Sequence, residues 1–286
     1  MMMVPIIAIA WLVMQIKKTE SSRDISIVKP TSLSVPRAAP AASDTSRDEE
    51  LLGETEPSGE QRQPALFREA PVAPDALFAV LATGKPTVDA RVHQLQRMRG
   101  ISLSQAERER ALAFLSGKDA PTGIGQGSLQ WLADELLTVL RQQNPPWPGL
   151  AAALGETAYQ PGIHPVVRDY IMQHLGHLWE QAGPRPEIRE ALWKALDTTD
   201  ETTPGTALIA LSKGFTRDAE LEDLAATRER AMALVTAPSS TLAVRVTALT
   251  IAAESGSDEV KELAKSLVKN PQTPFMLKNV AERALR

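Results

Sequence analysis

Apolar side chains recur every three or four residues from residue 75 to the end of the chain, with polar side chains between them. Because an α-helix turns by about 100° per residue, this spacing gathers the apolar side chains on one helical face. The same region contains no run of alternating β-branched and polar residues, so no strand is expected. The pattern predicts an all-α body with helices at 75–83, 86–99, 103–116, 128–143, 147–157, 164–182, 185–197, 203–214, 221–236, 239–255, 257–269 and 273–285.

Residues with known preferences for helix ends support these boundaries. Glu107 follows Ser104 by three residues, which is the spacing of a capping box. Prolines occupy first-turn positions, where their missing N–H costs little, at Pro86, Pro165, Pro186, Pro204 and Pro274. Glycines follow the predicted helix ends, where glycine is favoured, at Gly84, Gly100, Gly117, Gly183 and Gly256. Most connections between the helices are therefore short.

The predicted helices repeat in pairs. Those that start at 185, 221 and 257 are spaced by 36 residues, and those that start at 164, 203, 239 and 273 have a similar spacing. A short pattern also recurs, in which an apolar residue precedes Arg or Lys and apolar or small residues follow on the same stripe. It occurs at Val167-Arg168, Ile188-Arg189, Val244-Arg245 and Leu277-Lys278. One helix pair cannot bury its own apolar face, so the period predicts a stack of mutually covering pairs.

These repeats resemble the HEAT-repeat and armadillo-type α-solenoid families over residues 160–286, with a degenerate extension back to residue 86. The resemblance is carried by Pro165–Arg168, Leu242–Leu249 and Phe275–Leu285. It implies antiparallel helix pairs stacked as a HEAT-like α-solenoid that presents a groove to a partner. Asp169 is expected to form hydrogen bonds between repeats, whereas the 203–214 unit lacks the family's inter-helix Asp.

The first sixteen residues, MMMVPIIAIAWLVMQI, carry no charge, and Lys17 and Lys18 follow them. As a helix these sixteen residues would span about 24 Å. A full membrane crossing needs roughly 20 residues, so the run is slightly short. No basic side chain precedes the run and no small-x-small cleavage site follows it directly. We therefore expect residues 1–18 to be an uncleaved membrane anchor. The alternatives are a helix buried against the body and a cleaved signal.

Residues 19–74 have the composition of a disordered linker. Seven prolines lie between residues 30 and 74, eight serines lie between 21 and 58, and no aromatic residue occurs between Trp11 and Phe67. Asp48, Glu49 and Glu50 form an acidic cluster beside Leu51-Leu52. Such a segment buries too little apolar area to offset its conformational entropy. We expect a tether between the anchor and the helical-repeat domain, 75–286. A long tether after an N-terminal anchor favours an extracytoplasmic body, although two lysines beside the anchor favour the cytoplasm.

Composition and charge exclude several kinds of function. The chain has 31 Lys and Arg against 35 Asp and Glu, a net charge of −4, so a general nucleic-acid binder is not expected. It contains no cysteine, which excludes disulfides, thiolate metal sites and cysteine nucleophiles. Gly123, Gly125 and Gly127 precede a predicted helix, but no strand comes before them, as a nucleotide-binding loop requires.

Three histidines carry the alternative hypothesis of an enzyme or a metal-dependent protein. His174 and His177 are three residues apart on one predicted helix, and His164 precedes that helix. Imidazoles at this spacing can be neighbours and can bind a metal. A His-x-x-His pair on a helix is more often part of an ordinary helical surface or core edge. No nucleophile or paired carboxylates complete a catalytic constellation, so we expect no enzyme activity and no cofactor.

The four tryptophans of the body, Trp131, Trp147, Trp179 and Trp193, are expected to be its large apolar anchors. Trp147 lies among prolines in the connection 144–148, and Tyr159 lies in a second connection that contains Pro161 and Gly162. Tryptophan and tyrosine are enriched in binding hot spots, and they also plug loops over a core. Trp147 and Tyr159 are the predicted partner-binding residues. The sequence thus predicts a non-enzymatic, membrane-tethered helical-repeat scaffold that binds a protein or peptide partner.

Overall fold

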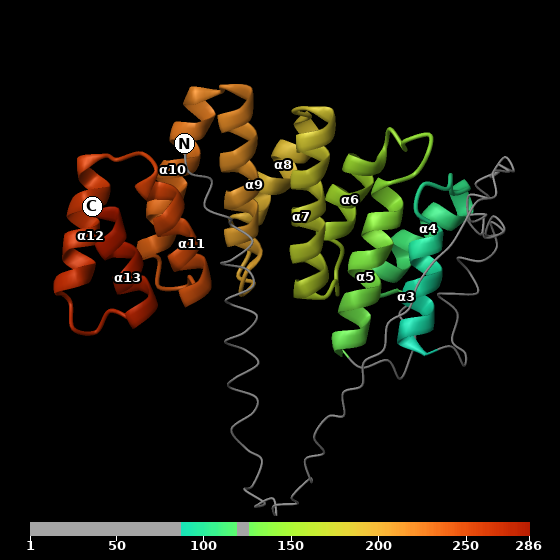
Figure 1. Cartoon of the computed structure of the whole chain (residues 1–286), viewed down its shortest axis with the longest axis horizontal. Coiled ribbons are helices and arrows are strands. Elements are labelled where there is room, and N and C mark those ends of the chain that lie inside the picture. The colour runs from blue at the N-terminus through green and yellow to red at the C-terminus, as the bar shows by residue number, and fades with distance from the viewer. Residues whose placement is uncertain (1–86, 119–125) are drawn as a thin grey trace, which may run out of the picture. The chain divides into compact units, whose positions relative to one another are not determined.

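The structure is a computed structural model that describes residues 87–118 and 126–286. The chain divides into two units, Met1–Ala70 and Pro71–Arg286, and all the described residues belong to the second. This part of the chain contains eleven helices and no strand (Figure 1), which confirms the all-α prediction. The predicted anchor at 1–18, the linker at 19–74 and the helix at 75–83 lie outside the described residues.

The helices follow the predicted order. They are α3 (Val88–Arg97), α4 (Gln105–Leu115), α5 (Gln126–Arg141), α6 (Leu150–Ala158), α7 (Pro165–Ala182), α8 (Pro186–Ala195), α9 (Thr203–Asp218), α10 (Leu221–Thr236), α11 (Leu242–Ala253), α12 (Asp258–Lys269) and α13 (Phe275–Ala284). None of these described helices is both long and apolar enough to cross a membrane.

The residues at the helix ends explain most of these boundaries. Ser104 and Glu107 form both hydrogen bonds of the predicted capping box at the start of α4. Pro165, Pro186 and Pro204 occupy first-turn positions as predicted. Pro274 instead is the N-cap residue of α13. Gly183 ends α7 with φ 80°, a left-handed value that a residue with a Cβ rarely adopts.

The helices form an interlocked arrangement of pairs. α3, α5, α7, α9, α11 and α13 pack in this order, each against the next, and we call them the odd row. The intervening helices pack as pairs against them: α4 with α5, α6 with α7, α8 with α9, α10 with α11 and α12 with α13. All eleven helices contribute to one cluster of buried apolar side chains. Each of these pairs is therefore covered by its neighbours.

The contact between α7 and α9 is unusually close because it contains small residues. A Cβ added at Gly176 would lie 3.0 Å from the Cβ of Ala210. One turn along α7, the Trp179 ring lies directly over Gly214, where an added Cβ would be 2.5 Å from Cε2. The sequence predicted that α9 ends at 214, but the helix continues to Asp218. The extra turn is stabilised because Phe215 is fully buried against Trp179, with ring centroids 5.0 Å apart in a T-shaped arrangement.

Hydrogen bonds act both between successive pairs and within a pair. Asp169 of α7 accepts a hydrogen bond from the Thr206 hydroxyl of α9 at 2.7 Å, the inter-repeat role predicted for Asp169. Arg168 Nε donates to the carbonyl of Ala158 at the end of α6, at 2.8 Å. Arg245 Nε donates at the same distance to Val235, near the end of α10. Both arginines are the fourth residue of their helices and reach ten residues back, so the sequence pattern corresponds to a repeated interaction.

We expect Gly214→Ala to lower the free energy of unfolding by about 1–3 kcal/mol, because its Cβ would overlap the Trp179 ring and force α7 and α9 apart. Gly127→Ala in α5 is the matched control, since no atom lies within 4 Å of an added Cβ there. Alanine at an open helical position should be neutral or slightly stabilising. Urea denaturation of the full chain measures both changes. Equal stabilities of the two variants would contradict the packing described for α7 and α9.

Candidate functional site

The two predicted partner-binding residues lie at opposite ends of α6. Trp147 lies in the connection from α5 to α6, and Tyr159 is the C-cap residue of α6. The nine residues of α6 separate them by about 13 Å along the helix axis. The structure therefore does not bring Trp147 and Tyr159 into one site, and each has its own surroundings.

Trp147 is half-buried and held by its neighbours. The guanidinium carbon of Arg108 lies 5.1 Å from the Trp147 ring centroid, within the range of a cation–π contact. Arg108 in turn donates from Nε to Gln143 Oε1 at 3.0 Å. The buried Gln143 also accepts from the backbone N–H of Leu103 and donates to the carbonyl of Leu140. Side chains of α4 and the end of α5 thus fix the position of the indole ring.

A cavity of about 300 Å³ opens beside this ring, and we call it the Trp147 cavity. Its floor is the buried set Leu150, Ala151 and Ile188. Its walls are more exposed and also largely apolar: Pro146, Trp147, Pro148, Leu178 and Ala182. A volume of this size accommodates one or two aliphatic side chains, and it is at the lower end of the range for small-ligand pockets.

Three polar side chains, Arg141, Gln181 and Arg185, also line the cavity, and the two arginines carry its charge. Arg185 donates from Nη1 to the carbonyl of Pro148 at 3.3 Å, which orients its guanidinium at the cavity. Nε of Arg141 is buried and has no hydrogen-bond partner among the described residues. Burial lowers the pKa of Arg141, although the nearby Asp134 and Glu180 oppose this shift. Two guanidinium groups beside an apolar floor suit an apolar side chain next to an acidic one.

Tyr159, in contrast, is used within the fold. Its hydroxyl donates to the carbonyl of Ala191 in α8, and Lys194 Nζ lies 4.0 Å from its ring centroid. Burial raises the pKa of the Tyr159 hydroxyl well above its usual range. Tyr159 therefore joins α6 to α8, and both its hydroxyl and one ring face are occupied.

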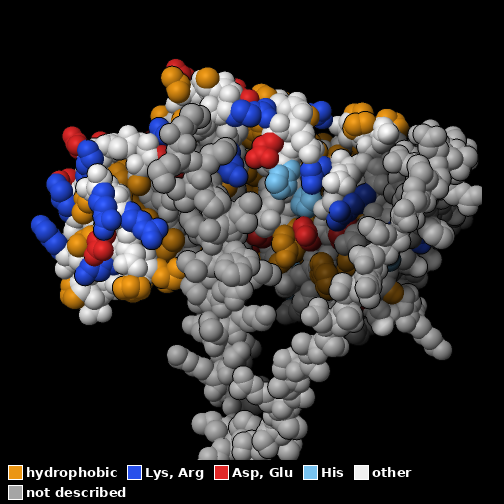
Figure 2. All heavy atoms as spheres, in the orientation of Figure 1, with side chains coloured by type: hydrophobic (Ala, Val, Ile, Leu, Met, Phe, Trp, Pro, Cys, Tyr) orange, Lys and Arg blue, Asp and Glu red, His pale blue; other side chains and the backbone are white. Residues whose placement is uncertain are grey.

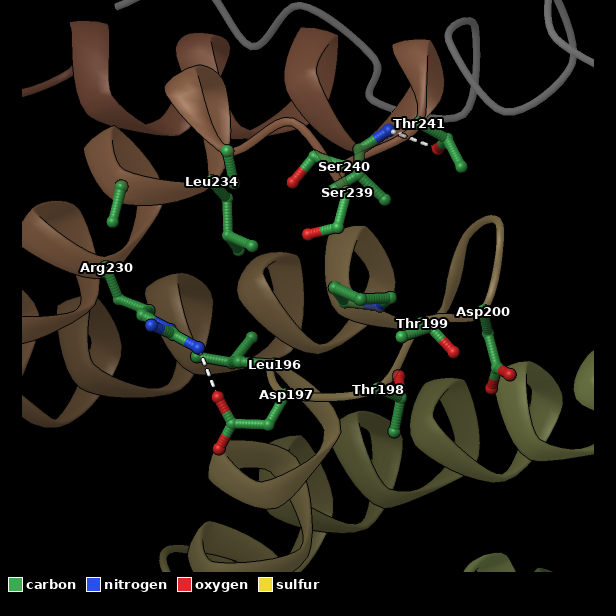
Figure 3. Close-up of a pocket in the computed structure, with 14 residues that line it drawn as sticks. Leu196, Asp197, Thr198, Thr199, Asp200, Arg230, Leu234, Ser239, Ser240 and Thr241 are labelled. Carbon is green, nitrogen blue, oxygen red and sulfur yellow. Dashed lines mark hydrogen bonds and ion pairs between the residues drawn. The ribbon is translucent and has the colours of Figure 1, made fainter.

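A second cavity of about 270 Å³ lies between the α8–α9 and α10–α11 connections (Figure 3). Hydroxyls line much of it: Thr198, Thr199, Ser239, Ser240 and Thr241. The charges at its edge are already paired, since Arg230 bonds to Asp197, and Arg168 and the Thr203 hydroxyl both bond to Asp200. Its charged groups therefore stabilise the two connections. The sequence analysis did not predict this cavity. The signal that could have indicated it is the presence of Ser and Thr in both connections, which lie about one period apart.

The three histidines of the alternative hypothesis do not converge. The His164 side chain accepts from the backbone N–H of Val166 and caps α7, about 15 Å along the helix from His174. His174 Nε2 lies 3.2 Å from Asp134 Oδ1, and His177 Nδ1 lies 3.3 Å from Glu180 Oε2. Figure 2 shows histidines near the middle of one face with acidic and basic side chains beside them. Within the described residues, no group of three or more His, Asp and Glu could hold a metal ion.

His174 is buried with one unsatisfied nitrogen. Its side chain is only about 5 % exposed, and Nδ1 has no hydrogen-bond partner in the described part of the chain. Burial lowers the pKa of His174, and the hydrogen bond to Asp134 only partly opposes the shift. The imidazole is therefore neutral in the folded protein at neutral pH.

Of the four tryptophans expected as anchors, one departs from that expectation. Trp179 is fully buried, and Trp147 and Trp193 are half-buried against the core. Trp131 of α5 is 51 % exposed and lies outside both cavities. The helical position of Trp131 puts it on the outward side of α5, so residue type alone gave the wrong expectation.

Comparisons of this chain with protein-family models, curated proteins and solved structures found no match. The resemblance to HEAT-type repeats therefore stays a prediction from the residues quoted above.

We expect the free energy of unfolding to fall as the pH is lowered from about 6.5, the usual pKa of histidine. Below this pH the unfolded chain binds a proton at His174, whereas His174 in the folded chain stays neutral because its pKa is lowered. The loss of stability therefore continues until the pH reaches the lowered pKa of the folded state. The His174 contribution is at most about 1.4 kcal/mol per pH unit. His174→Gln should flatten this dependence, because glutamine retains a donor for Asp134 and does not titrate.

His177→Gln is the control, since His177 is exposed and is the smallest of the causes that lower the His174 pKa, so this variant should change the dependence far less than His174→Gln does. Denaturation curves between pH 5 and 8 give the free energy of unfolding of the wild type, His174→Gln and His177→Gln, each as the full chain. An undiminished slope in the His174→Gln variant would contradict a neutral, buried His174.

Proposed function

We propose that the body is a HEAT-like α-solenoid. The continuous odd row supports this arrangement, as do the paired helices that pack against it. The repeated arginine contacts of Arg168 and Arg245 are spaced by 77 residues, close to two periods of the repeat. In such a stack the connections lie alternately at two edges, and the Trp147 cavity belongs to one of them.

The function that these features support best is a non-enzymatic scaffold that binds a segment of a partner protein in the Trp147 cavity. The observation that carries this proposal is the cavity itself: an apolar floor, a fixed indole ring and two arginines at one place. Fixed aromatic side chains next to apolar pockets are typical binding hot spots. Arg141 and Arg185 would add specificity for a segment that carries a carboxylate.

The N-terminal sequence supports a tethered scaffold. Residues 1–18 have the composition of a membrane anchor, and 19–74 that of a flexible linker, so the body would be held near a membrane, on its extracytoplasmic side in this proposal. Tethering increases the effective concentration of the body relative to a membrane-bound partner, which permits a modest intrinsic affinity.

The enzyme alternative receives less support. No histidine lines either of the two cavities described above. His174 is buried, and its Nε2 contacts the carboxylate of Asp134. A general base has to reach a substrate, which a side chain about 5 % exposed does poorly.

To test the scaffold proposal, the full-length tagged protein would be crosslinked gently in its native membranes and the co-purifying protein identified. The partner would then be purified and its affinity measured for three proteins: wild type, Trp147→Ala and Trp131→Ala. We expect Trp147→Ala to weaken binding at least tenfold, because a central aromatic side chain in an apolar pocket contributes about 1.4 kcal/mol or more.

Trp131→Ala removes an exposed indole on α5 that lines neither cavity, so it should bind the partner like the wild type. Urea denaturation would show that both variants remain folded. A partner that binds all three proteins equally would refute a role for the Trp147 cavity.

A further inference from the structure

The end of α12, the start of α13 and the connection between them carry positive charge without opposing carboxylates. We call this region, residues 263–281, the α12–α13 edge. It contains Lys265, Lys269 and Lys278 and no Asp or Glu, in a chain whose net charge is −4. Lys265 pairs with Glu262, whereas neither Lys269 nor Lys278 forms an ion pair with a described residue. The first-turn carboxylates of α12 lie about 15 Å along the helix from Lys269, so the positive charge at this edge is largely uncompensated.

Apolar side chains are exposed at the same edge. Phe275, the first residue of α13, is 77 % exposed, and Pro271 and Pro274 of the connection are exposed beside it. Leu242, the first residue of α11, is 39 % exposed, and α11 packs against α13 and runs in the same direction (Figure 1). Figure 2 shows hydrophobic side chains along the lower side of this region, with Lys and Arg side chains next to them. An exposed aromatic side chain is thus bordered by lysines.

This combination fits an anionic lipid surface better than a protein. Protein–protein interfaces are enriched in Arg and depleted in Lys, whereas the α12–α13 edge contains three lysines and no arginine. Surfaces that lie on anionic bilayers combine Lys or Arg with exposed aromatic and aliphatic side chains. There the ammonium groups interact with lipid phosphates, and the apolar side chains enter the boundary between headgroups and acyl chains.

We propose that the α12–α13 edge docks on an anionic phospholipid bilayer. Phe275 enters the interfacial region, and Lys269 and Lys278 interact with lipid phosphates. This contact goes beyond the proposed function, because it holds the body directly on the membrane near which the proposed tether would keep it. In the proposed stack, the α5–α6 connection lies at the opposite edge from the α12–α13 connection. Docking therefore leaves the Trp147 cavity facing away from the bilayer and open to the partner.

A fluorescent label in the α12–α13 connection tests this contact in the full chain. The sequence contains no cysteine, so Gln272→Cys supplies a single thiol at an exposed position for an environment-sensitive dye. The labelled protein is combined with vesicles of phosphatidylcholine alone, or of phosphatidylcholine with phosphatidylglycerol. We expect the dye emission to shift to the blue with the anionic vesicles only. The shift should be lost at high salt, which screens the attraction between the lysines and the lipid phosphates.

Two matched double variants, each made in the labelled protein, separate the edge from general charge. Lys269→Gln with Lys278→Gln should lower the ratio of docked to undocked protein at least tenfold, since each cation beside an anionic bilayer contributes about fivefold. Lys118→Gln with Lys213→Gln removes the same charge from exposed lysines outside the edge and should leave the ratio unchanged. Urea denaturation would show that both variants remain folded.

The proposal is overturned if the dye responds equally to both kinds of vesicle, or if the Lys269 and Lys278 variant keeps the shift. A shift with duplex DNA but not with anionic vesicles would assign the edge to nucleic acid instead. Weaker binding of the co-purified partner to the same variant, without any response to vesicles, would assign it to a protein. Trp147→Ala should leave the shift unchanged, and flotation with neutral vesicles reports the N-terminal anchor separately. Failure of the scaffold proposal is therefore distinguishable from failure of lipid docking.

Discussion

The close contact of α7 with α9 is the constraint on which the middle of the structure depends. Trp179 fits over Gly214 because that residue lacks a side chain, and the Trp179 indole N–H donates to Asp218 at 2.7 Å. Arg189 of α8 lies over both Trp179 and Phe215, with its guanidinium carbon 5.6 and 5.3 Å from the ring centroids. One large side chain on α7 thus fixes the spacing and direction of α8 and α9. The side of α7 toward α8, where Leu178 and Ala182 line the Trp147 cavity, takes its position from the same contact.

Periodicity and helix-end residues predicted the order of the described helices well, because both signals are local. α10 has the predicted bounds, and the capping box at Ser104 and Glu107 is present as expected. The predicted end of α9 was wrong, because its last turn is stabilised by Phe215 packing on Trp179. Trp179 lies 36 residues earlier in the chain, so local spacing could not indicate this contact. Contacts over one full period depend on how neighbouring pairs are aligned, and local spacing does not determine that alignment.

The candidate site was predicted only in part for a similar reason. Trp147 was found from its residue type and its proline-rich connection, but Arg141 carries no sequence signal that separates it from other arginines at helix ends. The separation of Trp147 from Tyr159 was available from the sequence, because two connections that flank a single helix must lie at its opposite ends. His174 was expected at a helical surface or core edge rather than in a metal site, and the structure buries it.

Contacts between helices in the described chain run mainly from each element to the next few in order. Within the described residues the buried apolar cluster extends along the row, and its main contacts join neighbouring helices. A helix pair gained or lost at one end of the row would therefore leave the remaining pairs in place. Phe275, 77 % exposed on α13, lies where such an added pair would find an apolar surface ready to be covered. In the proposed stack of repeats, the length of the body is a property that selection can change in whole steps of one repeat.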